Sequence, residues 1–102
     1  MSAIEGKPTD GRTRVMVLAE GEKLLMCLME MDAGGDTPLH SHDHESAGLL
    51  LKGRLRTTID GRIYELEVGD GFLHPAGVEH SVEAIEDAVW LEVKAPAHQA
   101  WS

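Results

Sequence analysis

Short apolar segments separated by glycine-containing turns recur along most of the chain. Segment 55–59 alternates apolar and polar residues with a period of two, the pattern of a strand with one buried face. Asp60-Gly61 then favours a tight hairpin into the partner strand 62–68. The predicted strands are 13–19, 23–31, 37–42, 47–51, 55–59, 62–68, 72–74, 81–85 and 89–93. Many short strands at regular spacing predict an all-β fold, a sandwich or a barrel.

Two further hairpins follow from the turn residues. Segments 13–19 and 23–31 flank Glu20-Gly21, and segments 81–85 and 89–93 flank residues 86–88, so we expect each pair to be antiparallel neighbours. The run 23–31 lacks clean alternation, which predicts that the core covers one face and a second sheet or a second subunit covers the other. A helix is the alternative for this run because Leu and Met favour helices, but the flanking glycines and the lack of a capping signal favour a strand.

The length of 102 residues fits one domain with a modest core. Residues 1–12 are polar and contain two glycines and a proline, which predicts a flexible N-terminal arm. We therefore expect a single domain over residues 13–96, followed by a tail at residues 97–102.

Charge and composition exclude several classes of partner. The net charge of -9, from 18 acidic and 9 basic residues, and the absence of a basic run argue against a nucleic-acid partner. No apolar run approaches the ~20 residues of a membrane span, and the first residues do not resemble a signal peptide, so we expect no membrane association and a cytoplasmic protein. The single cysteine, Cys27, lies in an apolar run; it cannot form an internal disulfide and is expected to be buried.

Three histidines form the most informative pattern in the chain. His40 and His42 lie two residues apart on an expected strand, so their rings should point the same way. Two imidazoles are half of a transition-metal site, but one short strand cannot surround a metal. We therefore expect His80, from a separate segment, to supply the third nitrogen.

The spacing around these histidines resembles the two sequence motifs of the cupins. The matching positions are Gly34, His40, His42, Ser46 and Gly53 in the first motif, and Gly69, Pro75, Gly77 and His80 in the second. The resemblance implies a double-stranded β-helix, or jelly-roll, barrel that is usually a homodimer. It also implies a divalent transition metal held by His40, His42 and His80, with iron, nickel, manganese, zinc and copper all open.

The fourth ligand is where the chain departs from the cupin pattern. The glutamate or glutamine of the family falls at Ser46, whose hydroxyl is a poor metal ligand. Three outcomes are open: a three-histidine centre completed by water, entry of Glu45 or His44 after a change of register, or loss of the metal. A one-residue slip would turn Glu45 to the opposite face, so the three-histidine centre is favoured unless a bulge intervenes. Three nitrogens with open positions suit a catalytic metal.

Two further residues are candidates for proton transfer. His74, just before Pro75, is expected either to line the cavity as an acid or base near pH 7, or to be a buried histidine bonded to backbone. On the last strand Trp90, Glu92 and Lys94 share one face; if Val89, Leu91 and Val93 fill the core, that face meets solvent or a partner. Cupins of pectin breakdown, which this chain resembles, instead point an acid from the Glu92 position into the site. The aromatic residue and arginine that accompany it there fall at Lys94 and His98 here.

These residues support two hypotheses of different kinds. The first is an enzyme in which the metal polarises a carbonyl or enol oxygen of a small polar or sugar-acid substrate while Glu92 or His74 moves a proton. Isomerase, lyase and dioxygenase chemistry all fit that arrangement. The second is a non-catalytic small-molecule or metal-binding cupin, which the serine at position 46 favours.

Overall fold

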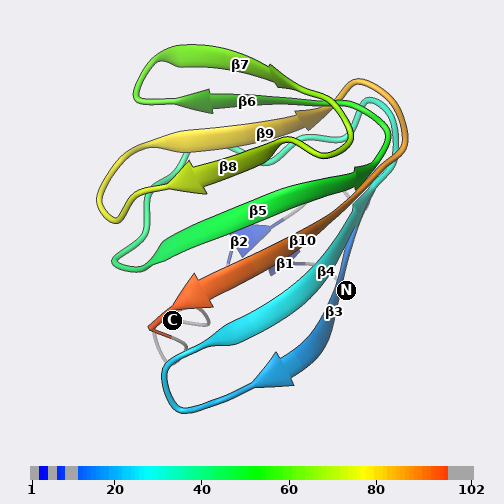
Figure 1. The fold of residues 1–102 in the computed structure, drawn as a ribbon. Helices are drawn as coiled ribbons and strands as arrows, with labels where there is room; N and C mark the ends of the chain where they lie inside the picture. Colours follow the sequence, from blue (N-terminus) through cyan, green and yellow to red (C-terminus); the bar gives the residue numbers. More distant parts are fainter. Residues whose placement is uncertain (1–2, 5–6, 9–11, 97–102) are drawn as a thin grey trace.

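The computed structural model of the chain describes residues 3–4, 7–8 and 12–96 (Figure 1). These residues form strands and turns, without a helix, as the sequence predicts. The strands are β1 (Ala3–Ile4), β2 (Lys7–Pro8), β3 (Thr13–Glu20), β4 (Leu25–Met31), β5 (Glu45–Lys52), β6 (Leu55–Ile59), β7 (Arg62–Leu66), β8 (Gly71–His74), β9 (His80–Ala84) and β10 (Ala88–Ala95). Within the described ranges, no helix is long and apolar enough to cross a membrane.

The strands from β3 onward form two antiparallel sheets, a five-stranded one in the order β3-β4-β10-β5-β8 and a three-stranded one in the order β7-β6-β9. Figure 1 shows β6, β7 and β9 gathered on one side of the molecule and β3, β4, β10 and β5 on the other. The predicted double-sheet barrel is confirmed. The expected arm, residues 1–12, contains the paired strands β1 and β2, and its flexibility stays a prediction. The expected tail, residues 97–102 with His98, lies outside the described residues.

Two of the three predicted hairpins are confirmed. β3 pairs with β4, and β6 pairs with β7 around Asp60-Gly61, whose φ angles of 51° and 79° are those of a tight hairpin turn. The predicted β9–β10 hairpin is wrong, because β9 pairs with β6 whereas β10 lies between β4 and β5.

The short β9–β10 connection crosses from one sheet to the other. The amides of Ile85 and Glu86 donate to the carbonyl of Arg54 at 3.0 and 3.4 Å, which holds this crossing against the β5–β6 crossing. Gly53 has φ 82°, and a Cβ atom there would lie 2.1 Å from the Asp87 carbonyl oxygen. Turn residues indicate where the chain reverses but not which sheet the next strand joins. The sequence therefore favoured a β9–β10 hairpin that does not form.

The predicted strand 37–42 is also wrong. The segment runs along β9 and forms only two isolated bridges, Asp36 to Glu83 and His40 to His80. Pro38 between them has no N–H to donate to a ladder. The register also shifts by one residue from the first bridge to the second, as in a bulge.

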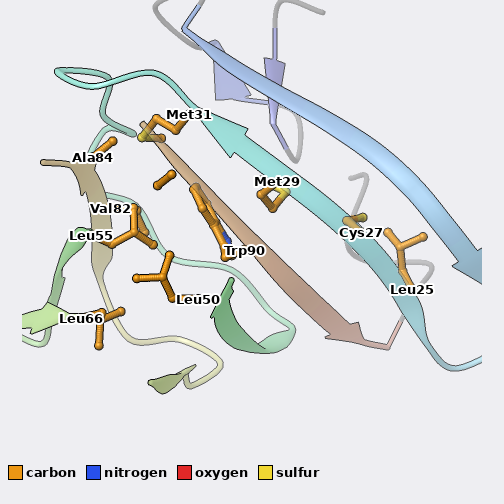
Figure 2. Close-up of a cluster of buried hydrophobic side chains, with 11 residues drawn as sticks. Leu25, Cys27, Met29, Met31, Leu50, Leu55, Leu66, Val82, Ala84 and Trp90 are labelled. Atoms are coloured by element: carbon orange, nitrogen blue, oxygen red, sulfur yellow. The ribbon is translucent and has the colours of Figure 1, made fainter. Parts of the chain in front are cut away.

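Figure 2 shows the apolar core between the sheets, with Trp90 of β10 among side chains of β4, β5, β6 and β9. Along β4 the buried residues alternate with half-buried ones, which confirms the strand and excludes the alternative helix. Cys27 is fully buried there, as expected. One face of β4 thus packs on the core, and cover of the other face by a second subunit stays a prediction.

The orientation of β10 reverses one expectation. Trp90, Glu92 and Lys94 point into the barrel and are 1%, 6% and 1% exposed, so the inference that this face meets solvent or a partner is wrong. The polar groups find partners inside, because Trp90 Nε1 donates to Glu92 Oε1 at 2.9 Å and Lys94 Nζ lies 3.3 Å from Glu92 Oε2. The apolar residues Val89, Leu91 and Val93 lie half-buried on the outer face.

Candidate metal centre

Three imidazole rings converge at one end of the barrel interior. One ring nitrogen from each of His40, His42 and His80 can be chosen so that all three lie within 4.8 Å of one another. Their ring centroids are 4.4 to 5.3 Å apart. Among the histidine, cysteine and acidic side chains of the described ranges, these three form the group whose ligand atoms lie close enough together to hold one metal ion. The structure thus brings together the three residues that the sequence singled out, and their binding of a metal stays a prediction.

Backbone hydrogen bonds hold the two histidine-bearing segments together. The amide of His40 donates to the carbonyl of His80 at 3.0 Å, and the amide of His80 donates to the carbonyl of His40 at 2.7 Å. The amide of Gly77, at φ 76°, donates to the carbonyl of His42 at 2.7 Å. The rings converge because these bonds align the segment before β5 with the start of β9, although residues 37–42 form no strand.

The donor set fits a divalent transition metal. The Nδ1 atoms of His40 and His80 bond to the backbone carbonyls of Pro38 and of Val78, the latter at 3.2 Å. A carbonyl only accepts, so Nδ1 of each neutral ring donates and Nε2 keeps its lone pair, the usual state of a metal-ligating histidine. Burial, together with the neighbouring His40, lowers the pKa of His80 to about 4, so its ring is neutral at pH 7.

The three candidates for a fourth ligand lie in different places. Ser46 is buried on the inner face of β5, between Lys94 of β10 and His74 of β8. His44 is also buried, its ring stacks on His42 at 4.5 Å, and burial lowers its pKa. Glu45 is exposed on the outer face, and the β5 register is unbroken from Glu45 to Leu49. The bulge that would turn Glu45 inward is therefore not present.

His74 lies beside the three rings. It is 3% exposed, its ring stacks on His80 at 4.0 Å, and its Nε2 lies 3.0 Å from Thr57 Oγ1. It lines a cavity of about 20 Å³ together with His40, His80 and Glu92, large enough for an ion or a water molecule. Burial first, and then the neighbouring histidines, lower the pKa of His74 to about 3. At neutral pH this imidazole is therefore uncharged.

Glu92 and Lys94 form a buried pair against this cavity. Burial raises the pKa of Glu92, while the hydrogen bond from Trp90 opposes the shift. Burial lowers the pKa of Lys94 to about 7. The two pKa values move toward each other because both charges are unfavourable in a dry interior.

Two residues of the site escaped the sequence analysis. Lys94 was expected on the outer face because the apolar residues Val89, Leu91 and Val93 on the other side of β10 were assigned to the core. The large side chain of Trp90, which shares a face with Lys94, was the signal that this face points inward. Thr57 was assigned no role, although its place between Leu55 and Ile59 puts it on the inner face of β6. Glu92 does face the cavity. His98 lies outside the described residues.

Comparison with known proteins identifies the family. The family model described as "Cupin domain" matches residues 27–94, which is most of the chain. The solved structures include an RmlC-like cupin from Shewanella frigidimarina, with 23% identity, a TM-score of 0.84 and cover of 90% of this chain and 83% of that one. KdgF from Halomonas sp. matches with 22% identity, a TM-score of 0.81 and cover of 85% and 82%.

A third similar structure is an RmlC-like cupin from Desulfovibrio desulfuricans, with 27% identity, a TM-score of 0.75 and cover of 85% of each chain. No curated protein matched the sequence. The family match covers both histidine-bearing segments, the topology is that of the similar structures, and the three histidines of the motifs converge inside the barrel. The chain belongs to the cupin family.

Proposed function

We propose that this cupin is a mononuclear metal enzyme acting on a small carbonyl, enol or sugar-acid substrate. The proposal rests mainly on the convergence of His40, His42 and His80, whose candidate ligand atoms lie within 4.8 Å of one another. The Nδ1–carbonyl bonds of His40 and His80 support it, because they leave Nε2 of each ring with a lone pair for a metal.

A divalent transition metal bound there supplies a Lewis acid for a carbonyl or enol oxygen. Glu92 reaches the cavity wall beside His40 and His80, and burial raises its pKa, which favours the protonated form that can act as an acid. His74 on the same wall is neutral, and its pKa of about 3 makes it a weak base, so it suits accepting a hydrogen bond from the substrate better than taking up a proton. Met29, Val82 and Trp90 complete the apolar part of the wall. Isomerase and lyase chemistry both move a proton beside a polarised oxygen, whereas dioxygenase chemistry would also require O₂ and a redox-active metal.

Metal loading tests the proposal first. The full-length protein is reconstituted anaerobically with iron, nickel, manganese, zinc or copper in turn, repurified, and its metal is measured by elemental analysis. We expect about one metal per chain for at least one ion, and less than about a tenth of that in His42→Gln, because two imidazoles do not complete the site. His74→Gln is the matched control and retains the metal, since His74 lies beside the triad without belonging to it.

Product formation by the metal-loaded protein tests whether it is an enzyme. The loaded protein is incubated with a dicarbonyl compound in the presence of oxygen and, separately, with an unsaturated sugar acid, and products are followed by NMR. Glu92→Gln and His74→Gln are expected to keep the metal and lose turnover. Metal below about half an equivalent for every ion would instead favour the non-catalytic binding protein, which Ser46 in place of a carboxylate supports.

We also propose that the protein is a homodimer through the outer face of its larger sheet. Leu91 of β10 lies in register between Leu28 of β4 and Leu49 of β5, and Met16 of β3 extends this row. Met16 and Leu49 are 57% and 40% exposed in the single chain. An apolar sheet face of this kind favours cover by a second copy. Light scattering after size exclusion is expected to give a dimer for the wild type and for Ile63→Glu on β7, and a monomer for Leu91→Glu.

A further inference from the structure

Two other rings contact the imidazole of His74. It stacks on His80 at a centroid distance of 4.0 Å, and Phe72 lies against it at 4.8 Å. Phe72 has its place because residue 48 is glycine, since a Cβ atom there would lie 2.1 Å from Phe72 Cζ. These contacts and the hydrogen bond of Nε2 to Thr57 restrict the orientation of the imidazole.

The hydroxyl of Thr57 determines whether Nε2 of His74 donates or accepts a hydrogen bond. Thr57 is 1% exposed and its Oγ1 makes two hydrogen bonds, one of 2.9 Å to the carbonyl of Ser81 and one of 3.0 Å to His74 Nε2. A hydroxyl has one proton to donate, and a carbonyl oxygen only accepts. The proton of Thr57 therefore goes to Ser81, and its lone pair faces His74, so Nε2 of His74 must be the donor.

We propose that Thr57 is a positioning residue that locks His74 in the tautomer with its proton on Nε2 and leaves Nδ1 as the acceptor. No hydrogen bond of Nδ1 to any residue in the described ranges competes for that lone pair, and His74 lines the cavity with His40, His80 and Glu92. The tautomer is the reverse of the one in His40 and His80, where Nδ1 donates and Nε2 keeps the lone pair.

The difference separates two uses of histidine in one site. The bonds of His40 and His80 to backbone carbonyls orient Nε2 for a metal, whereas the bond of His74 to Thr57 leaves Nδ1 as a hydrogen-bond acceptor. The catalytic consequence rests on the proposed function: in the other tautomer His74 presents an N–H where an acceptor for the substrate is needed. The tautomer itself follows from the Thr57 contacts alone.

Nitrogen NMR tests the proposal directly. The full-length protein, labelled with ¹⁵N in its histidines, is studied at neutral pH with and without Zn²⁺, and long-range ¹H–¹⁵N correlations show which nitrogen of each ring is protonated. His74→Gln identifies the signals of His74. We expect protonated Nε2 in the wild type and in Thr57→Ser, which keeps the hydroxyl. Thr57→Val keeps the volume but removes the acceptor, and a form protonated on Nδ1 is expected to appear.

A wild-type spectrum with His74 protonated on Nδ1 would overturn the proposal, and so would a Thr57→Val spectrum with the wild-type tautomer. If Thr57→Val does not fold, the wild-type and Thr57→Ser spectra still decide. A protein that shows the expected tautomer but takes up no metal would refute the proposed function and leave this inference standing. With a substrate identified, Thr57→Val is expected to lower kcat by about 10-fold with unchanged metal content and little change in KM, and Thr57→Ser is expected to restore it.

Discussion

The interior of the barrel has an apolar end and a polar end, built by the same strands. On β9, His80 faces the polar end while Val82 and Ala84 face the core; on β10, Glu92 and Lys94 follow Trp90 along one inner face. The apolar end is packed by side chains of Figure 2 such as Leu55 and Ala84, whereas at the polar end Cys27 and Leu25 lie in register with Glu92 and Lys94, and several titratable groups are buried close together.

The contrast indicates how the fold divides its tasks. Burial of apolar side chains supplies the favourable free energy of folding, and burial of imidazole, carboxylate and ammonium groups opposes it. The polar end is therefore retained at the expense of stability, which is expected where residues serve binding or catalysis. Substitutions at the apolar end should accordingly change stability, whereas those at the polar end should also change the pH dependence or the metal chemistry.

The largest effect is expected at the apolar end. Trp90→Ala removes the largest buried side chain and is expected to lower the free energy of unfolding by about 3 to 5 kcal/mol, because the cavity left behind adds to the lost burial. Denaturant unfolding measures the change. Ile63→Ala on β7, where the side chain is 66% exposed, is the control and should stay within about 0.5 kcal/mol of the wild type. Equal losses in the two variants would contradict the assignment of the core.

The next effect concerns the buried pair. Lys94→Met leaves Glu92 buried without its cation and is expected to cost about 3 kcal/mol. Adding Glu92→Gln removes the isolated carboxylate, so the double variant should regain most of that loss in the same unfolding assay. A double variant no more stable than Lys94→Met would show that the two residues do not act as a pair.

A smaller effect is the pH dependence that the buried histidines impose. The pKa values of His74 and His80 fall from 6.5 in the unfolded chain to about 3 and about 4 in the fold, so below pH 6.5 the unfolded state binds protons that the folded state does not. Stability is thus full above pH 6.5 and falls on acidification, by roughly 1.4 kcal/mol per pH unit for each histidine. Thermal unfolding of the protein without added metal between pH 6.5 and about 5 measures this slope, above the range in which most carboxylates titrate.

His74→Gln, with one neutral histidine fewer, should show a shallower slope over the same range. A stability that is flat or rises on acidification there would contradict the burial of these rings as neutral groups.

Much of the fold and the three converging histidines could be predicted from the sequence, because strand alternation and hairpin turns are local signals and the two histidine-bearing motifs have fixed spacings. The sheet joined by β10 could not be predicted, since the turn at residues 86–88 reverses the chain whichever sheet follows. The inner face of β10 could not be predicted either, because both sets of alternating residues contain large side chains. Which set points inward depends on the interactions that Trp90, Glu92 and Lys94 form inside the barrel. The tautomer of His74 depends on Thr57, a contact between residues 17 positions apart that no local pattern reveals.

The most direct test of the account is an anomalous difference map of the metal-loaded protein, collected at the absorption edge of the ion it takes up. The account predicts one strong peak at roughly 2.0 to 2.2 Å from a ring nitrogen of each of His40, His42 and His80, with Glu45 outside the coordination sphere. A crystal without a peak between the three rings, or with the ion bound elsewhere, would contradict it.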